Sequence, residues 1–471
     1  MRLSSPTGSR RQAPPRWPVL ALAAALAGCA GLTPQDARLP DAPVPATWST
    51  GSSTTGPATP LALWWQRLGD AQLTALVEQA LAANTSVRTA QAALQQARAQ
   101  VDVQAAELAP QVGASASAQR SRSGNSGTGN SFQLGFDASW EPDVFGRVRA
   151  GVNASEADAR AAEASLADVQ VSLAAEVAVN YIELRSLQQR LAIAQSNLAS
   201  QGETLQITQW RLQAGLTTSL VAEQARAASE QTAAQIPALE ASLAQSRHSL
   251  AVLTGQAPAA LDAQLAAGAA VPQAPDELAL AIPAETLRQR ADVRAAEQRI
   301  RAALSRVSQA EAARYPDFGI SGSVGLRALT LGALGGGSAL AASLLGSVSL
   351  PLLDGGANRA QVRAQEASLE QARIAYQAAV LAALKDVEDA LVSLRGNRER
   401  LVRLTSAADA AGNAALLAQQ RYRSGLIDFQ AVLETQRTQL STQDGVATTV
   451  ASVSADHVRL YKALGGGWQP Q

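Results

Sequence analysis

The sequence predicts a mainly α-helical fold with a small β part, and three observations lead to this fold class. Long stretches are rich in Ala, Gln, Arg, Glu and Leu, and they contain few helix breakers. Four runs of about nine or ten residues instead alternate between apolar and small or polar side chains. This order of features occurs twice along the 471 residues. We therefore expect a duplicated unit of long antiparallel coiled-coil helices, each copy interrupted by a β-hairpin.

The start of the chain predicts an export signal. The apolar run "WPVLALAAALAG" follows several arginines, and no acidic residue precedes Cys29. A run of about a dozen residues is too short to span a bilayer as a mature helix. The following Leu26-Ala27-Gly28-Cys29 resembles a bacterial lipobox, which implies a lipoprotein signal peptide over residues 1–28. The alternative is an ordinary secretory signal with a chance cysteine.

Cys29 is the only cysteine, so no disulfide can form within the chain. We expect a lipid on its thiol, which would hold the chain end at a membrane surface. Residues 29–60 are rich in Pro, Ser, Thr and Gly and have no apolar periodicity, as in an extended tether. Apart from this covalent lipid, we expect no cofactor.

The charge balance and the histidines exclude several classes of function. Lys and Arg together number 39, as do Asp and Glu, so no basic field indicates nucleic acid. The two histidines, His248 and His457, lie far apart, and we expect both on helix surfaces. Neither has a triad partner or a phosphate loop close to it in sequence. We therefore expect no enzyme activity, no catalytic residue and no metal site.

Two copies of one unit make up the rest of the chain. The segment that begins at Val87 aligns with the one at Val293 and brings Pro110 onto Pro316. Later, "RLQAGL" matches "RYRSGL", and "LAVLTG" matches "LYKALG". We assign residues 61–268 to the first repeat, and 269–471 to a crossover linker followed by the second repeat.

The longest helix of the first copy is expected over residues 147–212, which contain no proline. About 65 residues at 1.5 Å each would extend roughly 100 Å. Large apolar residues recur there every seven positions, which favours a coiled-coil seam over an ordinary helical bundle. The seam of the first copy is Val177, Leu184, Leu191, Leu198, Leu205 and Leu212, and that of the second is Val387, Leu394, Leu401, Ala408, Ala415 and Tyr422.

The alternating runs predict two hairpins, at about 110–142 and 316–351. Each strand has the length of a membrane strand, with one apolar face and one small or polar face. The uncharged stretch 328–353 has a rival interpretation as a transmembrane helix. Several glycines within it, and a polar counterpart in the first copy, favour the hairpin.

Four strands cannot close a barrel, and an open sheet edge in lipid leaves backbone groups without hydrogen bonds. The chain must therefore share strands with further copies of itself. Eight strands from a dimer or twelve from a trimer would satisfy this requirement equally.

Four segments resemble the outer membrane efflux family of TolC-like channels, in particular its lipidated OprM/NodT branch. They are "WWQRLGDAQLTALVEQALAAN", "LRQRADVRAAEQRI", "PLLDGGANRAQV" and "LYKALGGGW". The resemblance implies a homotrimer with a twelve-stranded barrel in the outer membrane of a Gram-negative bacterium and a periplasmic helical tunnel. Thr85 and Ala291 stand where the family often has proline, which leaves the starts of two helices to be checked.

The resemblance also gives the helix-joining turns a role. It implies that Gly215, Leu216, Thr217, Gly425 and Leu426 form tips that contact a periplasmic adaptor. The glycines by themselves are explained by helix-ending turns, and solvated turns are the alternative.

The segment "DFQAVLETQ" aligns with the part of the family that narrows the tunnel entrance. This implies that Gln430 and Glu434, four residues apart on one helix face, form an entrance constriction. A solvated position for Glu434 is the alternative.

The function expected is an outer membrane channel of a tripartite efflux system. It would act as a passive duct for small molecules such as drugs and toxic compounds, delivered by an inner-membrane pump and its adaptor. One alternative is an exit duct for type I protein secretion or metal efflux. Another is a lipid-anchored periplasmic coiled-coil scaffold without a pore.

Overall fold

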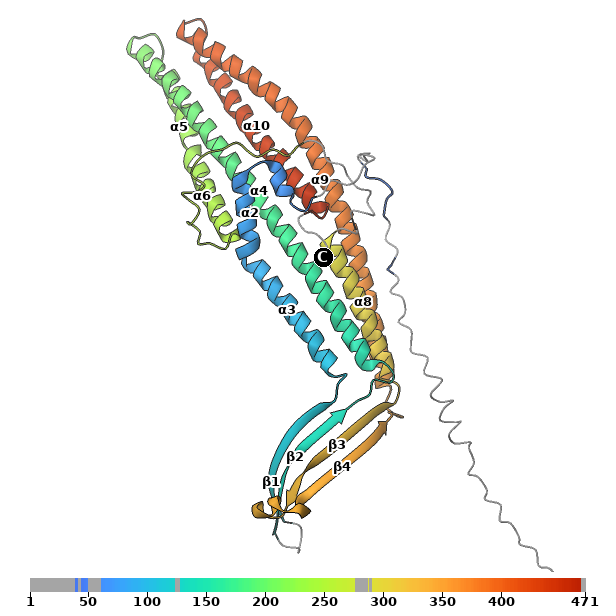
Figure 1. Ribbon diagram of the computed structural model, residues 1–471. Coiled ribbons are helices and arrows are strands. Elements are labelled where there is room, and N and C mark those ends of the chain that lie inside the picture. Colours follow the sequence, from blue (N-terminus) through green and yellow to red (C-terminus); the bar gives the residue numbers. More distant parts are fainter. Residues whose placement is uncertain are drawn as a thin grey trace, which may run out of the picture. The chain divides into compact units, whose positions relative to one another are not determined.

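A computed structural model describes residues 39–40, 44–49, 61–122, 128–275, 287 and 290–466. Two compact units make up the chain (Figure 1). The sheet unit holds residues 99–157 and 301–371, and the helical unit holds residues 39–98, 158–300 and 372–471. The helices are α2 (Ala71–Ala83), α3 (Thr85–Ala106), α4 (Arg147–Gln213), α5 (Ser219–Ala233), α6 (Gln235–Leu253), α8 (Ala291–Ala312), α9 (Ala357–Arg423) and α10 (Phe429–Ala463), with short 3-10 helices η1 (Trp64–Leu68), η2 (Leu331–Gly335) and η3 (Gly337–Ala339).

The two long helices confirm the expected helical fold. Helices α4 and α9 each contain 67 residues. Both are rich in alanine and free of proline, so no backbone N–H is missing from their hydrogen-bond ladders. Helices α3 and α8 begin at Thr85 and Ala291, where the family often has proline. Both helices therefore begin at the expected residues, although neither has a proline there.

The predicted leucine seam of α4 holds only in part: Leu191, Leu198 and Leu205 are half-buried, and the last position is wrong. Val177 and Leu184 are fully buried, but Leu212 is exposed. The buried positions of this part of the helix are instead Ala194, Asn197, Gln201, Thr204 and Thr208. The seven-residue period persists through small and polar side chains, which hydrophobicity alone does not detect.

The returning helices differ between the two copies. Helix α10 runs unbroken for 35 residues, whereas its counterpart is divided into α5 and α6 at Ala234. Pro237 explains the division because it has no N–H to donate to the carbonyl of Ala233.

The sheet has four antiparallel strands: β1 (Gln111–Arg122), β2 (Thr128–Trp140), β3 (Asp317–Ala328) and β4 (Leu340–Ser349). They lie in the order β1-β2-β3-β4, so β1 and β4 form the two edges (Figure 1). Each strand falls in one of the four alternating runs. The stretch 328–353 forms η2, η3 and β4, so its interpretation as a transmembrane helix is wrong. Among the described residues, no helix is both long and apolar enough to cross a membrane.

The register of the sheet gives it one apolar and one polar face. All three strand pairings run without a bulge, so alternate residues keep to one face throughout. Ser115 donates a hydrogen bond to Asp137 on the polar face, at 2.6 Å. The apolar face carries Val112, Ala114, Ala116, Ala118, Phe132, Leu134, Phe136, Trp140, Ile320, Val324, Leu326, Leu344 and Val348.

Two aspartates fix the starts of the long helices in the sheet unit. The Asp143 carboxylate accepts hydrogen bonds from the N–H groups of Val148 and Arg149, at 3.0 and 2.8 Å. The Asp354 carboxylate accepts from Gly356 and Asn358, at 2.8 and 2.9 Å. A carboxylate at a helix N-terminus satisfies N–H groups that have no partner within the helix.

The core of the helical unit contains a cluster of aromatic side chains. Trp64 of η1 packs against Tyr461 of α10, with 5.5 Å between ring centroids. His457 is buried beside Tyr461, and its Nε2 lies 2.8 Å from the Arg398 guanidinium. The prediction of a surface position is therefore wrong for His457, whereas His248 is exposed. The error arose because α10 is buried on most sides near its C-terminus, which its own sequence does not show.

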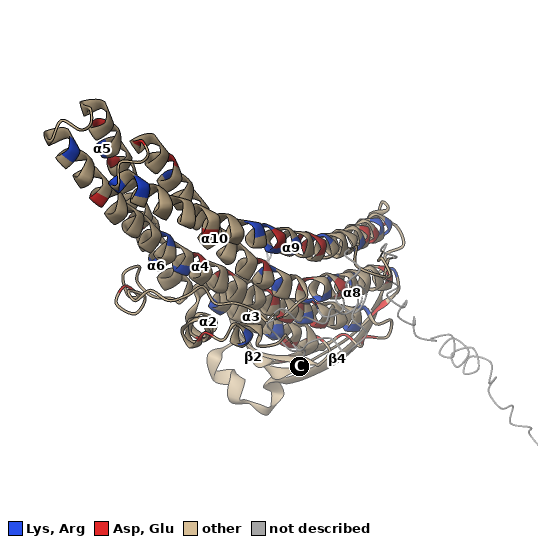
Figure 2. Cartoon of the chain, turned by 90° about the horizontal axis from the view of Figure 1, so that it is seen from above, with Lys and Arg blue, Asp and Glu red and all other residues tan. Residues whose placement is uncertain are grey.

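Charges of both signs alternate along the helices without forming a field of one sign (Figure 2). No group of three or more potential metal-ligating residues occurs in the part of the chain that the structure describes.

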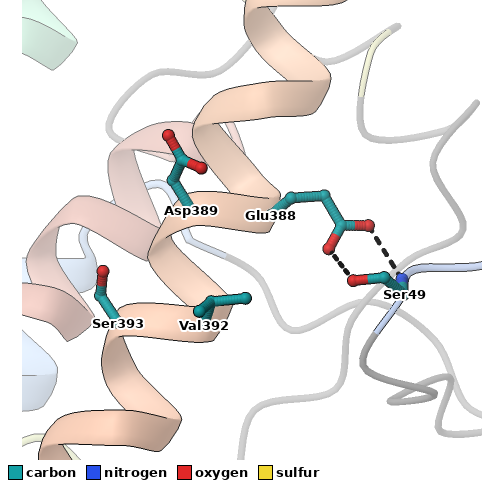
Figure 3. Close-up of a pocket in the computed structure, with 5 residues that line it drawn as sticks. All are labelled: Ser49, Glu388, Asp389, Val392 and Ser393. Atoms are coloured by element: carbon teal, nitrogen blue, oxygen red, sulfur yellow. Dashed lines mark hydrogen bonds between the residues drawn. The ribbon is translucent and has the colours of Figure 1, made fainter.

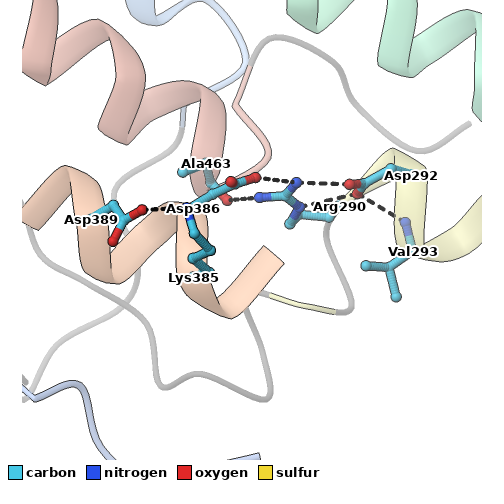
Figure 4. Close-up of polar contacts among 7 residues, drawn as sticks. All are labelled: Arg290, Asp292, Val293, Lys385, Asp386, Asp389 and Ala463. Atoms are coloured by element: carbon cyan, nitrogen blue, oxygen red, sulfur yellow. Dashed lines mark hydrogen bonds and ion pairs between the residues drawn. The ribbon is translucent and has the colours of Figure 1, made fainter. Parts of the chain in front are cut away.

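Arg290 joins three helices of the helical unit (Figure 4). Its guanidinium lies 2.7 Å from the Asp292 carboxylate and 3.1 Å from that of Asp386, and it donates to the carbonyl of Ala463 at 2.9 Å. Burial by itself raises the pKa of Asp292, but the hydrogen bonds and charge of Arg290 outweigh it, so this pKa lies below its usual range. The buried guanidinium is thus held by acceptors on α8, α9 and α10.

Arg290→Gln should lower the free energy of unfolding by about 2 kcal/mol, because two carboxylates lose their cation in a partly buried site. The depressed pKa of Asp292 stabilises the fold above about pH 4, and this contribution disappears as the pH falls further. The difference in melting temperature between wild type and variant should therefore shrink from pH 7 to below about pH 4. Lys385→Gln, which removes an exposed ion pair with Asp389, is the control. A difference that is constant with pH would contradict this account.

Candidate functional site

The tips of the two helical hairpins are built alike. The N–H of Leu216 donates to the carbonyl of Arg211 at 2.8 Å, and that of Leu426 donates to Arg421 at 2.9 Å. Gly215 and Gly425 have φ of 72° and 74°, which a residue with a side chain rarely adopts. These are the hydrogen bonds and glycine positions of a Schellman motif, so both turns end their helices in the same way.

The leucines of the tips have no role in the turns themselves. The side chains of Leu216 and Leu426 are 75% and 74% exposed. Thr217, by contrast, is half-buried. Each turn thus presents one large apolar side chain outward, on a backbone fixed by two hydrogen bonds.

An arginine of the first tip reaches the second tip. The guanidinium of Arg211 donates to the carbonyl of Tyr422 at 2.6 Å, and it lies 4.3 Å from the centre of the Tyr422 ring. The Tyr422 hydroxyl is 3.1 Å from that of Thr208. Sequence reasoning missed this contact. The only signal was Tyr422 itself, an aromatic side chain that follows Ala408 and Ala415 in the predicted seam.

The polar residues buried near the C-terminal end of α4 bind α10. Gln436 donates to the Thr204 hydroxyl at 3.1 Å, and Asn197 donates to Gln443 at 2.9 Å. These side chains hold the two hairpins together by hydrogen bonds that are directional and specific.

The two predicted constriction residues lie on the first turns of α10. Gln430 and Glu434 are both exposed, and their spacing of four places them on one face of the helix. Asp428 caps this helix by accepting a hydrogen bond from the N–H of Ala431 at 3.1 Å. The first residues of α10 are therefore well fixed, with the Glu434 carboxylate directed away from the core.

Part of the predicted tether, at Trp48 and Ser49, is bound to α9. Trp48 is 2% exposed and packs with Val380 and Val387. Ser49 donates to Glu388 from both its N–H and its hydroxyl (Figure 3). Cys29, the predicted lipidation site, lies outside the described residues.

The arrangement of two long helical hairpins and one small sheet matches known proteins. The sequence matches the family described as "Outer membrane efflux protein" over residues 76–256 and 282–466. The chain belongs to this family. Outer membrane protein OprJ of Pseudomonas aeruginosa is 31% identical, with 96% of each chain covered. Nodulation protein T of Rhizobium leguminosarum bv. viciae is 30% identical, over 91% of this chain and 89% of that protein.

A solved structure of this fold closely resembles the chain. The outer-membrane channel OprN has 36% identity and a TM-score of 0.85, over 92% of this chain and 100% of that one. The resemblance to TolC-like efflux channels is thus confirmed, and so is the outer membrane location. The protein functions as an outer membrane efflux channel.

Arg211→Gln should loosen the second tip by removing a hydrogen bond from a charged donor. We expect the amides of Gly425 and Leu426 to exchange with solvent roughly tenfold faster, corresponding to about 1.4 kcal/mol. Hydrogen exchange followed by mass spectrometry measures this rate. Arg421→Gln is the matched control, since this exposed arginine occupies the equivalent position of the other copy. Equal exchange in both variants would show that the Arg211 contact does not stabilise the tip.

Proposed function

We propose that the chain forms a homotrimer that serves as the passive exit duct of a tripartite efflux system. The observation that carries this proposal is the four-stranded sheet with two unpaired edges. In lipid, unpaired backbone groups cost several kcal/mol each, so β4 of one copy would pair with β1 of the next. Of the two closures that this allows, family membership favours the twelve strands of a trimer over the eight of a dimer.

The two faces of the sheet support a pore. The apolar face, with Phe132, Leu134 and Phe136, would face lipid, while the Gly- and Ser-rich face would line the lumen. The alternate residues from Phe132 to Trp140 extend about 27 Å at 3.4 Å per residue, close to the height of a membrane band.

The tips would bind the periplasmic adaptor of an inner-membrane pump, which delivers small molecules such as drugs or toxic compounds. Exposed Leu216 and Leu426 are the apolar side chains available for this contact. Cys29 would carry the lipid, and the contacts of Trp48 and Ser49 would hold this part of the tether on α9. The channel would perform no bond chemistry, because the pump supplies the energy.

A photo-reactive residue introduced at Leu216 or Leu426 should capture the adaptor in living cells. The crosslink forms because the side chain at either position is exposed and the turn beneath it is rigid. The captured partner is identified by mass spectrometry. The same residue at exposed Leu353, in the sheet unit, is the control. Capture of the adaptor from Leu353 but not from the tips would refute the tip assignment.

Glu434→Ala should raise basal conductance in a planar bilayer, or weaken the block by divalent cations. Three carboxylates that converge on a threefold axis would form a ring that binds cations and narrows the entrance. Glu434→Gln separates charge from size, because it removes only the charge. Unchanged conductance and unchanged block in both variants would place Glu434 on an ordinary solvated face.

A further inference from the structure

Two arginines extend the apolar face of the sheet at the tip of the first hairpin. In β1 the even-numbered residues from Val112 to Ala118 share the apolar face. The bulge-free pairing continues to the end of the strand, with Arg120 opposite Asn130 and Arg122 opposite Thr128. Both arginines therefore project from the apolar face, next to its last apolar residues.

No acidic side chain of the four strands lies on the same face as these two arginines. The acidic residues of the strands, Asp137 and Asp317, are odd-numbered in their registers and belong to the opposite face. The sequence from residue 118 to 136 contains no Asp or Glu. Both arginines are exposed, and neither forms an ion pair among the described residues.

The boundary between an apolar band and solvent is where lipid headgroups lie. A hairpin tip that leaves the sheet away from its helical connections would meet the outer leaflet, given the proposed function on which this step rests. The Cα atoms of two residues spaced by two on one strand face lie about 7 Å apart along the strand, so both side chains can reach one headgroup. Guanidinium forms bidentate hydrogen bonds with phosphate oxygens, and its planar shape suits this contact.

We propose that Arg120 and Arg122 bind the phosphate groups of the phosphorylated glycolipid of the outer leaflet. Its acyl chains would lie against the apolar face below, beside Ala118 and Phe132. The site thus combines an apolar surface for the chains with two cations for the headgroup. Each basic residue near an anionic lipid surface strengthens binding, and two together should strengthen it by roughly tenfold or more.

The test uses the detergent-solubilised full-length protein and bisphosphorylated lipid A, with binding followed by native mass spectrometry. The variant R120Q/R122Q should raise the apparent Kd by roughly tenfold. Arg327→Gln is the control, because it removes a cation from the same sheet on its polar face. Dephosphorylated lipid A should bind wild type as weakly as bisphosphorylated lipid A binds the double variant.

Several results would overturn the proposal. They are wild-type affinity in R120Q/R122Q, an equal loss in R327Q, undiminished binding of dephosphorylated lipid A, or displacement by an equal concentration of inorganic phosphate. The last result would indicate a site for free phosphate. Single variants of each arginine provide a second measurement if the double variant does not assemble.

Conductance of the wild type in a bilayer without glycolipid tests the channel function separately. The failure of the lipid proposal is therefore distinguishable from the failure of the channel proposal.

Discussion

The need to pair every backbone N–H and C=O in lipid is the constraint on which the proposed architecture depends. A sheet of four strands leaves two edges, β1 and β4, and one chain has no further strand among its described residues to cover them. Sharing edges between copies answers this need, and it explains why each chain contributes only a fraction of a barrel. The shared sheet in turn requires a helical part that can also associate around one axis.

The helical unit itself has an interior of two kinds. Near η1 the core is large and apolar, built around Trp64, Tyr181 and Tyr461. Toward the tips, a smaller apolar cluster around Tyr422 and Phe429 lies beside buried polar side chains, which form hydrogen bonds such as that between Gln436 and Thr204. An apolar core stabilises the fold in proportion to the apolar surface that it removes from water. Polar contacts are directional, so they specify one alignment of the helices. The large apolar core of the unit is thus distinct from the part that carries the tips.

Several features could be predicted from sequence because they are local. Glycine at 215 and 425 ends a helix through its own backbone freedom, and alternation in β1 to β4 follows from a period of two. The missed features join residues far apart in the chain. Arg211 contacts Tyr422, and His457 is buried by elements that its own helix does not specify.

The sequence by itself determined the length of α4, the four strands and the duplication, because periodicity and breakers act over a few neighbouring residues. Family membership followed from motifs spread along the whole chain. The tertiary structure decided which face of α4 is buried, where Arg290 finds its acceptors, and on which face Arg120 and Arg122 project. These depend on register and on packing between distant segments, where a shift of one residue reverses a side chain.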